Sequence, residues 1–271
     1  MIINKNPAGK GISMIENESV KYRVGIICPV SREYEACKKR LALGEETVYN
    51  KKKIARAFKN GIFITAVLAG FGKINCACAA GWLAGDLKCD ILIDSGSAGA
   101  LDGCCGIGDI VFSADVYEYD MLPVEKFKKF KSELSSATSL ASLIEIEGSA
   151  DIFAGYVKLA EAASGRAVFT GNCACGEKDV NSTKLKETLK NSYSCMICDW
   201  ESSAVVKTAN LRSVDCFSIR SVSDHADENM MKDYRANADG SLDKLYEAVA
   251  IFIYGGWMQK LFDRKNSFFS I

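Results

Sequence analysis

The sequence predicts an α/β protein whose central, mostly parallel mixed sheet is covered by helices. Short apolar runs rich in β-branched residues recur along the chain, and such runs are typical of strands buried on both faces. Segments with helical spacing or many small residues follow these runs, so that strands and helices alternate. Only three prolines occur in 271 residues and no internal boundary is evident, which favours a single domain.

The predicted strands are apolar runs, and most of them run into glycine, serine or acidic residues. In chain order they are expected at 24–30, 61–70, 89–101, 108–120, 166–176, at the start of 195–211, and at 214–224. The first, VGIICPV, is the clearest, because it is continuously apolar. The third contains SGSAG (95–99), which we interpret as a glycine-rich turn at the end of the strand.

The segments between these strands have the apolar spacing or the small residues of packed helices. Helices are expected at 31–41, 73–87, 151–164, in the second part of 195–211, and at 241–262. The last is amphipathic, and its apolar face is formed by Leu242, Leu245, Tyr246, Val249 and Phe252. The polar stretch 121–150, rich in lysine and serine, is interpreted as a loop with short helices.

The charge balance and the ends of the chain limit the partners and the location. Lys and Arg together number 34, as do Asp and Glu, so no net charge draws the protein to nucleic acid or to a membrane. Residues 1–22 lack the apolar run of a secretion signal, and we expect an N-terminal extension followed by a domain at 23–271. The longest apolar stretch, from Leu245, is interrupted and too short to span a bilayer. We therefore expect a cytoplasmic protein whose partners are small molecules or another copy of the chain.

Twelve cysteines raise the question of a metal site. One CxxC is present, Cys195 with Cys198, but no second CxxC or histidine pair completes a zinc set, and His225 is the only histidine. Many of the cysteines lie in segments predicted to be core, where cysteine behaves as a small hydrophobic residue. We therefore expect reduced packing cysteines, no metal and no cofactor, and a structural or exposed role for His225.

Polar residues follow several of the predicted strands. Ligands of such sheets gather beyond the carboxyl ends of the strands, and these ends carry three carboxylates: Glu33, Glu201 and Asp224. Each also has a simpler interpretation. Asp224 could cap the following helix, and Glu33 or Glu201 could be a solvated residue at the start of a helix.

Five motifs in a fixed order decide between these interpretations. They are VGIICPVSREYE, LAGFGKINCACAA, IDSGSAGAL followed by GDIV, DWESSA, and RSVSDHAD. Together they resemble the nucleoside phosphorylase and nucleosidase superfamily, and most closely the bacterial 5'-methylthioadenosine/S-adenosylhomocysteine nucleosidases. The resemblance implies a single-domain nucleoside phosphorylase-like fold and hydrolysis of the N-glycosidic bond of a purine nucleoside.

The resemblance also implies roles for individual residues. Cleavage of the bond to a purine needs an acid for the leaving base and a carboxylate that orients water, as in inverting glycoside hydrolysis. By resemblance, Asp224 is the acid, helped by Ser223, and its pKa must be raised to keep its proton near neutrality. Glu33 resembles the carboxylate that activates water, with Ser97 and Arg220 at positions that help to hold it.

The substrate-binding residues implied by the resemblance include two departures from the family pattern. Glu201 matches the carboxylate that accepts hydrogen bonds from the ribose, and the set is completed by Ala98, Gly99, Cys175 and Trp200. In GNCAC (171–175), Ala174 replaces an aromatic residue that stacks on the purine. In DWES, Trp200 replaces a methionine that packs on the sugar. The paired changes suggest that Trp200 supplies the missing aromatic surface; neutral divergence is the alternative.

Two other functions remain open from the sequence. A phosphorylase would need fixed cationic groups for phosphate, whereas Asp94 stands where hexameric phosphorylases carry an arginine and would repel the anion. A non-catalytic nucleoside-binding protein would need no acid together with a water-binding carboxylate. The resemblance favours the hydrolase, and it implies a homodimer in which the partner completes the pocket at the 5' end of the nucleoside.

Overall fold

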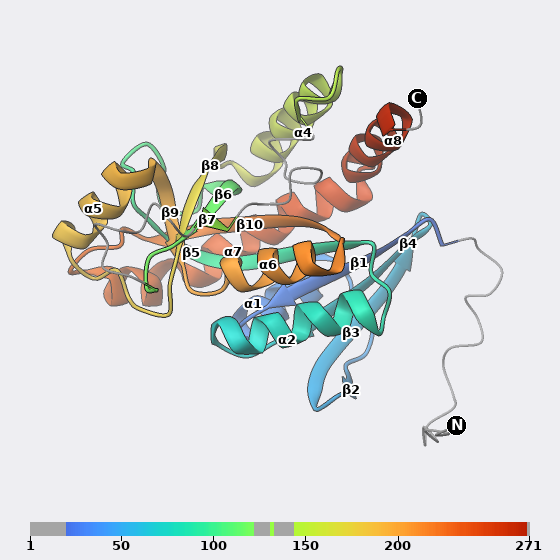
Figure 1. Cartoon of the computed structure of the whole chain (residues 1–271), viewed down its shortest axis with the longest axis horizontal. Helices are drawn as coiled ribbons and strands as arrows, with labels where there is room; N and C mark the ends of the chain where they lie inside the picture. The colour runs from blue at the N-terminus through green and yellow to red at the C-terminus, as the bar shows by residue number, and fades with distance from the viewer. Residues whose placement is uncertain (1–19, 122–130, 133–143, 270–271) are drawn as a thin grey trace.

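The computed structural model describes residues 20–121, 131–132 and 144–269. The expected extension at 1–22 lies almost entirely outside these residues, as does most of the loop predicted at 121–150. The described chain forms one mixed sheet with helices packed against both of its faces (Figure 1).

The elements follow one another as the sequence predicts, with some additions. The strands are β1 (Tyr22–Cys28), β2 (Thr47–Tyr49), β3 (Lys52–Lys59), β4 (Ile62–Leu68), β5 (Ile91–Ala100), β6 (Ile110–Glu118), β7 (Lys131–Ser132), β8 (Val168–Cys175), β9 (Cys195–Asp199) and β10 (Asp215–Asp224). The helices are α1 (Ser31–Arg40), α2 (Gly72–Gly85), α4 (Ser149–Ser164), α5 (Thr183–Tyr193), α6 (Ser202–Arg212), α7 (Met230–Tyr254) and α8 (Trp257–Phe269).

The order of the strands brings the ends of distant segments together. The sheet runs β10-β6-β8-β9-β5-β1-β4-β3-β2, and β10 also pairs with β5, which closes a ring of strands at one end. The β1–β4, β1–β5 and β5–β10 pairs are parallel, so the carboxyl ends of these four strands lie at the same edge. The predicted mixed α/β sheet is confirmed.

The core has a layer on each face of the sheet. On one face, α1, α4, α7 and α8 bury large apolar side chains such as Tyr34, Phe153 and Leu245. On the other face, α2 and α6 lie side by side (Figure 1) and pack small side chains such as Ala80 and Val205. The five residues predicted for the apolar face of the last helix are completely buried.

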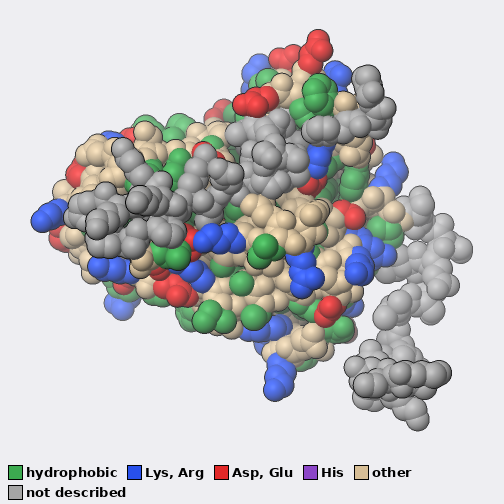
Figure 2. Space-filling model, viewed as in Figure 1, with side chains coloured by type: hydrophobic (Ala, Val, Ile, Leu, Met, Phe, Trp, Pro, Cys, Tyr) green, Lys and Arg blue, Asp and Glu red, His purple; other side chains and the backbone are tan. Residues whose placement is uncertain are grey.

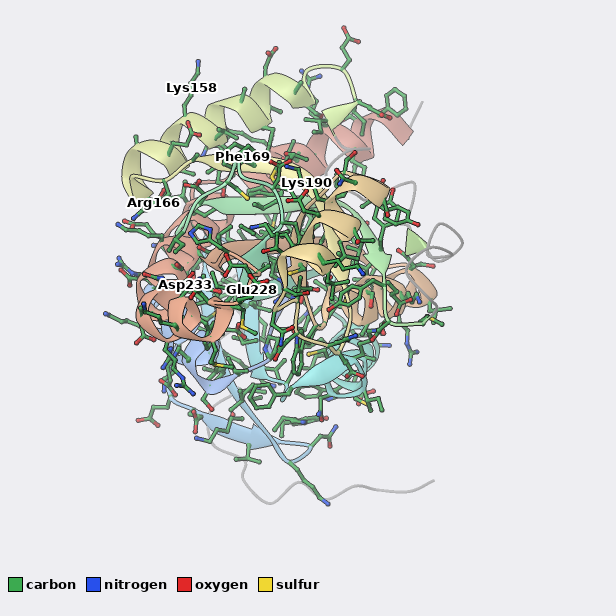
Figure 3. All side chains as sticks on the ribbon, turned by 90° about the vertical axis from the view of Figure 1, so that its left-hand side faces the viewer. Lys158, Arg166, Phe169, Lys190, Glu228 and Asp233 are labelled. Carbon is green, nitrogen blue, oxygen red and sulfur yellow. The ribbon has the colours of Figure 1, made fainter. Side chains whose placement is uncertain are left out.

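The surface is polar and of mixed charge. Figure 2 shows basic and acidic side chains interspersed over one face of the molecule, in agreement with the balanced composition. Lys158 on α4 points outward, away from the core (Figure 3). None of the helices in the described part of the chain is long and apolar enough to cross a membrane. All twelve cysteines are free, and all but Cys78 and Cys104 are buried, as expected of cysteines that pack in the core.

Three predictions about elements were incomplete or wrong. The hairpin of β2 and β3 was missed because the charged residues of KKIARAFK mask its alternation, a pattern common in strands near a sheet edge. SGSAG is not a turn but the last half of β5, paired with β10. The last predicted helix is two helices, because the chain breaks at Gly255 and Gly256, the latter with φ of +77°.

Candidate active site

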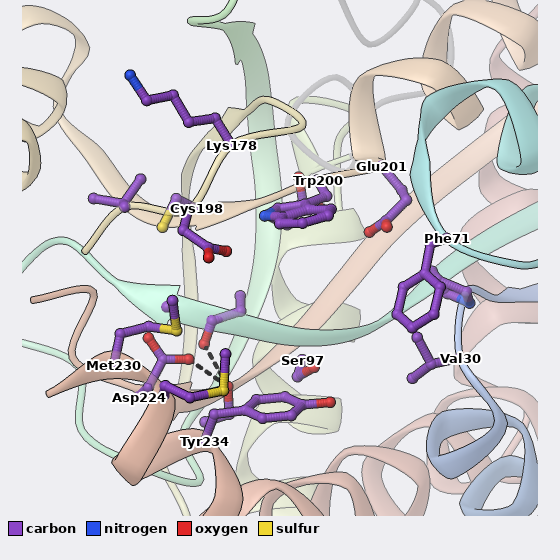
Figure 4. A pocket seen from close by; sticks show the side chains of 18 of the residues that line it. Val30, Phe71, Ser97, Lys178, Cys198, Trp200, Glu201, Asp224, Met230 and Tyr234 are labelled. Carbon is purple, nitrogen blue, oxygen red and sulfur yellow. Dashed lines mark hydrogen bonds between the residues drawn. The ribbon is translucent and has the colours of Figure 1, made fainter.

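A cavity of about 270 Å³ lies at the carboxyl ends of β1, β5, β9 and β10. This volume is near the lower limit of small-molecule sites, which is roughly 300 Å³. Figure 4 shows its walls, with Trp200 and Glu201 on one side and Asp224, Met230 and Tyr234 on the other. The lining residues are Pro29, Val30, Glu33, Phe71, Ser97, Ala98, Gly99, Tyr119, Lys178, Asp179, Val180, Cys198, Asp199, Trp200, Glu201, Ser223, Asp224, Met230, Met231 and Tyr234.

Glu33 is a buried carboxylate held at both oxygens. It lies in the first turn of α1 and is 3% exposed. Its Oε1 accepts hydrogen bonds from the Ser97 backbone N–H at 2.9 Å and from Ser97 Oγ at 3.0 Å, and its Oε2 accepts one from the Val30 N–H at 3.1 Å. Burial raises the pKa of Glu33, although the charge of Arg220 and these hydrogen bonds act to lower it. The carboxylate is therefore fixed and is a strong hydrogen-bond acceptor when ionised.

Asp224 lies at the end of β10, where the register with β5 shifts between Val222 and Asp224. Such an irregularity redirects the side chains that follow it. Asp224 Oδ2 accepts a hydrogen bond from Ser223 Oγ at 2.7 Å, and Oδ1 accepts one from the Ala226 N–H at 3.0 Å. Burial raises the pKa of Asp224, and these two hydrogen bonds only partly oppose it. The raised pKa suits a group that must keep a proton near neutrality.

Two glycines of β5 leave room for these carboxylates. A Cβ added at Gly96 would lie 2.4 Å from Glu33 Oε1, and one at Gly99 would lie 2.8 Å from Asp224 Oδ1. Real side chains do not approach so closely, so the strand must carry glycine where the two carboxylates pack against it. The SGSAG motif therefore positions acidic groups and does not act as a turn.

Arg220 lies beneath the cavity and organises its acidic groups. It is 1% exposed, donates to Asp94 at 2.7 Å and forms an ion pair with Asp199 at 2.7 Å. Burial opposes its charge, but the carboxylates of Asp199, Asp94, Glu201 and Glu33 raise its pKa above the ordinary value. The expectation that Asp94 faces and repels an anion is wrong, because Asp94 is completely buried and neutralised by Arg220.

Glu201 joins the cavity to the first turn of α2. It is 6% exposed, and its Oε1 accepts a hydrogen bond from the Gly72 N–H at 3.1 Å. Burial raises the pKa of Glu201 to about 8; Arg220 opposes the increase, and the charges of Asp199 and Glu33 add to it. Glu201 thus presents a carboxyl group whose protonation state changes near physiological pH.

The structure brings eight of the ten predicted site residues to the cavity wall. Arg220 and Cys175 do not line it. Cys175 was expected to bind substrate, but its side chain is completely buried and accepts a hydrogen bond from the Ser203 N–H at 3.4 Å. The reason is that the side chain points from β8 toward α6 and not toward the cavity. His225 is exposed and does not line the cavity, as expected.

Most of the apolar wall of the cavity was not predicted from the sequence. Met230, Met231 and Tyr234 come from the first turns of α7, and Phe71 and Tyr119 come from strand-to-helix and strand-end segments. The spacing of Met230 and Tyr234, four residues apart just after Asp224, is a helical signal that could have identified two of them. Phe71 lies in the motif LAGFGKINCACAA, directly after a predicted strand, and this position could have identified it. Nothing in the sequence marks Tyr119 as a wall of the same cavity.

The charge of the cavity is predominantly acidic. Among the described residues that line it, Lys178 is the only cationic one, whereas Glu33, Asp179, Asp199, Glu201 and Asp224 carry carboxyl groups. Nearby Arg32 forms an ion pair with Asp239 at 3.1 Å. In the described part of the chain, no group of three or more His, Cys, Asp or Glu is arranged to hold a metal ion.

The fold is thus a mixed α/β sheet with a small cavity at its carboxyl edge, in which Asp224, with a pKa raised by burial, and the fixed carboxylate of Glu33 both lie. The family model described as "Phosphorylase superfamily" matches residues 23–253. The chain belongs to this superfamily.

Relatives and solved structures agree with this assignment. A 5'-methylthioadenosine/S-adenosylhomocysteine nucleosidase of Desulfotalea psychrophila is 27% identical over 233 residues, covering 84% of this chain and 97% of the relative. The structure of the enzyme of the same name from S. pneumoniae, with a transition-state inhibitor, has a TM-score of 0.70 at 18% identity, covering 86% and 98% of the two chains. The futalosine hydrolase of Helicobacter pylori has a TM-score of 0.70 at 18% identity, covering 89% and 97%. The resemblance predicted from the five motifs is confirmed.

Proposed function

We propose that the protein is a nucleosidase that hydrolyses the N-glycosidic bond of a purine nucleoside such as 5'-methylthioadenosine or S-adenosylhomocysteine. The observation that carries the proposal is the presence in one cavity of Asp224, whose pKa is raised by burial, and Glu33, which is held by three hydrogen-bond donors. An acid and a water-binding carboxylate are the two groups that this reaction needs.

The reaction divides between the two carboxyl groups. Protonated Asp224 donates its proton to the purine as the bond between the base and the anomeric carbon breaks, which avoids an unstable anionic leaving group. Glu33 accepts a proton from the attacking water as the new C–O bond forms. The products are the free base and the free sugar. Glu201 accepts hydrogen bonds from the ribose hydroxyls, and Ser97 keeps Glu33 oriented.

The charges of the cavity favour water over phosphate as the nucleophile. Phosphate binding requires several fixed cationic donors, whereas the described lining offers Lys178 against five acidic residues. The nearby arginines are engaged, Arg220 with Asp94 and Asp199, and Arg32 with Asp239. The reason to prefer a hydrolase is therefore that these arginines are already paired, and not that Asp94 repels phosphate.

The names of the relatives support hydrolysis of an N-glycosidic bond more strongly than they support one particular substrate. One is a methylthioadenosine/S-adenosylhomocysteine nucleosidase and another is a futalosine hydrolase. Both names denote hydrolysis, but of different compounds. Trp200, which lines this cavity, departs from the pattern that the sequence resemblance implies. We therefore place the substrate only in the broader class of purine nucleosides.

A panel of nucleosides assayed with and without phosphate tests this proposal. We expect release of free base and free sugar without phosphate. A strict requirement for phosphate would establish a phosphorylase instead. Asp224→Asn should abolish most turnover while nucleoside binding persists, because only the proton donor is lost, whereas Asp179→Asn, in the same wall, should retain turnover. An Asp224→Asn variant as active as the wild type would contradict the assigned acid.

We also propose that the protein is a cytoplasmic homodimer. Phe71, which lines the cavity, and Ile74 on the same side of α2 are 69% and 78% exposed, and a second copy of the chain packed there would bury them and narrow the cavity. Twelve free cysteines suit a reducing compartment. Sedimentation of the wild type and of Ile74→Lys tests the dimer: we expect a dimer for the first and a monomer for the second.

A further inference from the structure

The segment 176–180, directly after β8, forms part of the cavity wall and is held through its backbone. The hydroxyl of Tyr119, directly after β6, donates hydrogen bonds to the carbonyl oxygens of Gly176, at 3.2 Å, and of Lys178. The Lys178 N–H also donates to the Gly176 carbonyl at 2.7 Å, which makes a three-residue turn. One phenol hydroxyl therefore holds both ends of this turn.

Two further hydrogen bonds hold the same turn from β6 and β9. Asp120 Oδ2 accepts a hydrogen bond from the Glu177 N–H at 2.8 Å, and the Gly176 N–H donates to the Asp199 carbonyl at 2.9 Å. Three consecutive residues are thus tied through backbone atoms to the ends of neighbouring strands. The strand ends therefore set the shape of the turn.

The ring of Tyr119 leaves room only for glycine at position 176. A Cβ added at Gly176 would lie 2.7 Å from the Cζ atom of Tyr119, closer than real side chains approach. Tyr119 is 3% exposed, and burial raises the pKa of its hydroxyl, so the phenol keeps the proton that it donates. The contact thus requires glycine at 176 and a hydroxyl at 119.

The turn leads into Val180, which lies on the Asp224 side of the cavity. Val180 is 4% exposed and lines the cavity. It belongs to a cluster of packed side chains that also contains Tyr119, Ala174, Cys198 and Ala226. The Ala226 N–H donates to Asp224 Oδ1 at 3.0 Å, and Figure 4 shows Cys198 and Asp224 at one end of the cavity and Glu201 at the other. Because the proposed function gives Asp224 the proton for the leaving base, this end of the cavity takes the purine.

We propose that Tyr119 is a positioning residue for the purine: by holding the turn at 176–178, it keeps the adjoining wall in the shape that packs on the base. The inference rests on the proposed function, because that function places the base beside Asp224. It also bears on Ala174, which replaces the stacking aromatic residue of the family pattern and is completely buried. The wall at the base is then formed by the segment after β8, and its shape is set from the end of β6.

The first test compares Tyr119→Phe with the wild type in steady-state kinetics and in the binding of adenine and hypoxanthine. The phenyl ring keeps the packing against Gly176 and loses only the hydroxyl. We expect KM, and the Kd of whichever purine the wild type binds, to rise about threefold to tenfold on loss of this hydrogen bonding. The value of kcat should stay within about twofold, because Asp224 and Glu33 are unaltered.

Tyr156→Phe is the matched control. The buried Tyr156 also donates from its hydroxyl to a backbone carbonyl, that of Ala248 at 3.3 Å, but it does not line the cavity. A general loss of stability should affect both variants, so unchanged KM and Kd in Tyr156→Phe would separate positioning from stability.

Gly176→Ala alters the same contact from the opposite side. Its Cβ would displace the turn from the Tyr119 ring, and KM should rise as in Tyr119→Phe. This variant keeps the test open if Tyr119→Phe does not fold. A wild-type KM in Gly176→Ala would contradict the inference.

Amide hydrogen exchange, followed by mass spectrometry, keeps the inference separate from the proposed function. The amides of 176–180 should exchange faster in Tyr119→Phe than in the wild type, while those of β5 and β10 stay protected. If the wild type released no base from any nucleoside, the proposed function would fail, and purine binding and exchange would decide the inference. Unchanged exchange at 176–180, a fall confined to kcat, or a wild type that binds neither purine would overturn it.

Discussion

At the scale of single residues, Asp224 and Glu33 are two carboxyl groups of one cavity with different surroundings. Both are buried, and burial raises the pKa of each. For Glu33, the charge of Arg220 and three hydrogen-bond donors oppose this increase in pKa, because they stabilise the ionised carboxylate. For Asp224, the largest effects that oppose the increase in pKa are the hydrogen bonds from Ser223 and Ala226. These different surroundings suit the two roles proposed for them, an acid at Asp224 and a water-binding carboxylate at Glu33.

Trp200 is a second residue whose place in the cavity bears on the proposed function. Ala174 is completely buried, so it offers no surface to a base, whereas Trp200 lines the cavity and is 36% exposed. Trp200 is therefore available as an aromatic wall, as the paired sequence changes suggested. That it contacts the nucleoside remains a prediction.

Trp200→Met should raise KM for the preferred nucleoside about twofold to tenfold, because an aromatic contact contributes roughly 0.5–1.5 kcal/mol beyond its buried area. The kcat value should change little, since neither carboxyl group is altered. Steady-state kinetics checks this, with Trp257→Met on α8, outside the cavity lining, as the control. Unchanged affinity for every nucleoside would mean that Trp200 does not supply the missing surface.

At the scale of elements, β5 is the strand that holds the site together. Its residues 96–99 pair with β10, and Ser97 and Gly99 contact the two carboxylates directly. The strand therefore sets the separation between Asp224 and Glu33. Glycine is required at positions 96 and 99 because the Glu33 and Asp224 carboxylates pack closely against the strand, and not because the chain turns there.

Gly99→Ala tests this role of β5. The new Cβ would lie 2.8 Å from Asp224 Oδ1 and 3.2 Å from Cys198 Sγ, so Asp224 must move. We expect kcat to fall by at least about tenfold and the free energy of unfolding to fall by about 1–3 kcal/mol. Kinetics and urea denaturation measure the two effects.

The control for this prediction is Gly103→Ala, because a Cβ there meets nothing within 4 Å. It should retain both activity and stability. A Gly99→Ala enzyme with wild-type kcat would show that the strand tolerates a shift of Asp224.

At the scale of the whole molecule, the closed ring of strands concentrates acidic groups in the interior. Glu33, Asp94, Glu201 and Asp224 are all buried, and burial raises the pKa of each. One buried cation, Arg220, offsets part of their charge. Ionisation of these carboxyl groups therefore lowers the free energy of unfolding.

The loss of stability on ionisation can be measured for Glu201. Its folded pKa of about 8 lies above its ordinary value of 4.5, so the folded state binds the proton more tightly than the unfolded state. The stability it contributes is complete below about pH 4.5 and is lost as the pH rises toward 8; the upper bound is about 5 kcal/mol. Urea unfolding at pH 5 and pH 8 should show a smaller loss in Glu201→Gln than in the wild type.

Glu187→Gln, on the exposed side of α5, serves as the control and should leave the pH dependence unchanged. If Glu201→Gln lost as much stability between the two pH values as the wild type, Glu201 would not be the group that titrates.

The sequence by itself determined the alternation of strands and helices, the apolar face of α7 and the three strand-end carboxylates. These depend on local periodicity and on short motifs, which a linear pattern records. VGIICPV predicted β1, and SIRSVSD predicted the strand that carries Asp224. The resemblance added the pairing of Glu33 with Ser97, which the hydrogen bonds between them support.

Only the tertiary structure decided which side chains share the cavity. The direction of a side chain at a strand end depends on register and on the neighbouring strand, so Cys175 points into the core although its motif suggested a binding role. Arg220 engages Asp94 and Asp199 because β10 pairs with β5 and lies near β9, a contact between segments far apart in the chain. Local patterns identified the chemical groups, and the packing of distant strands and helices arranged them into a site.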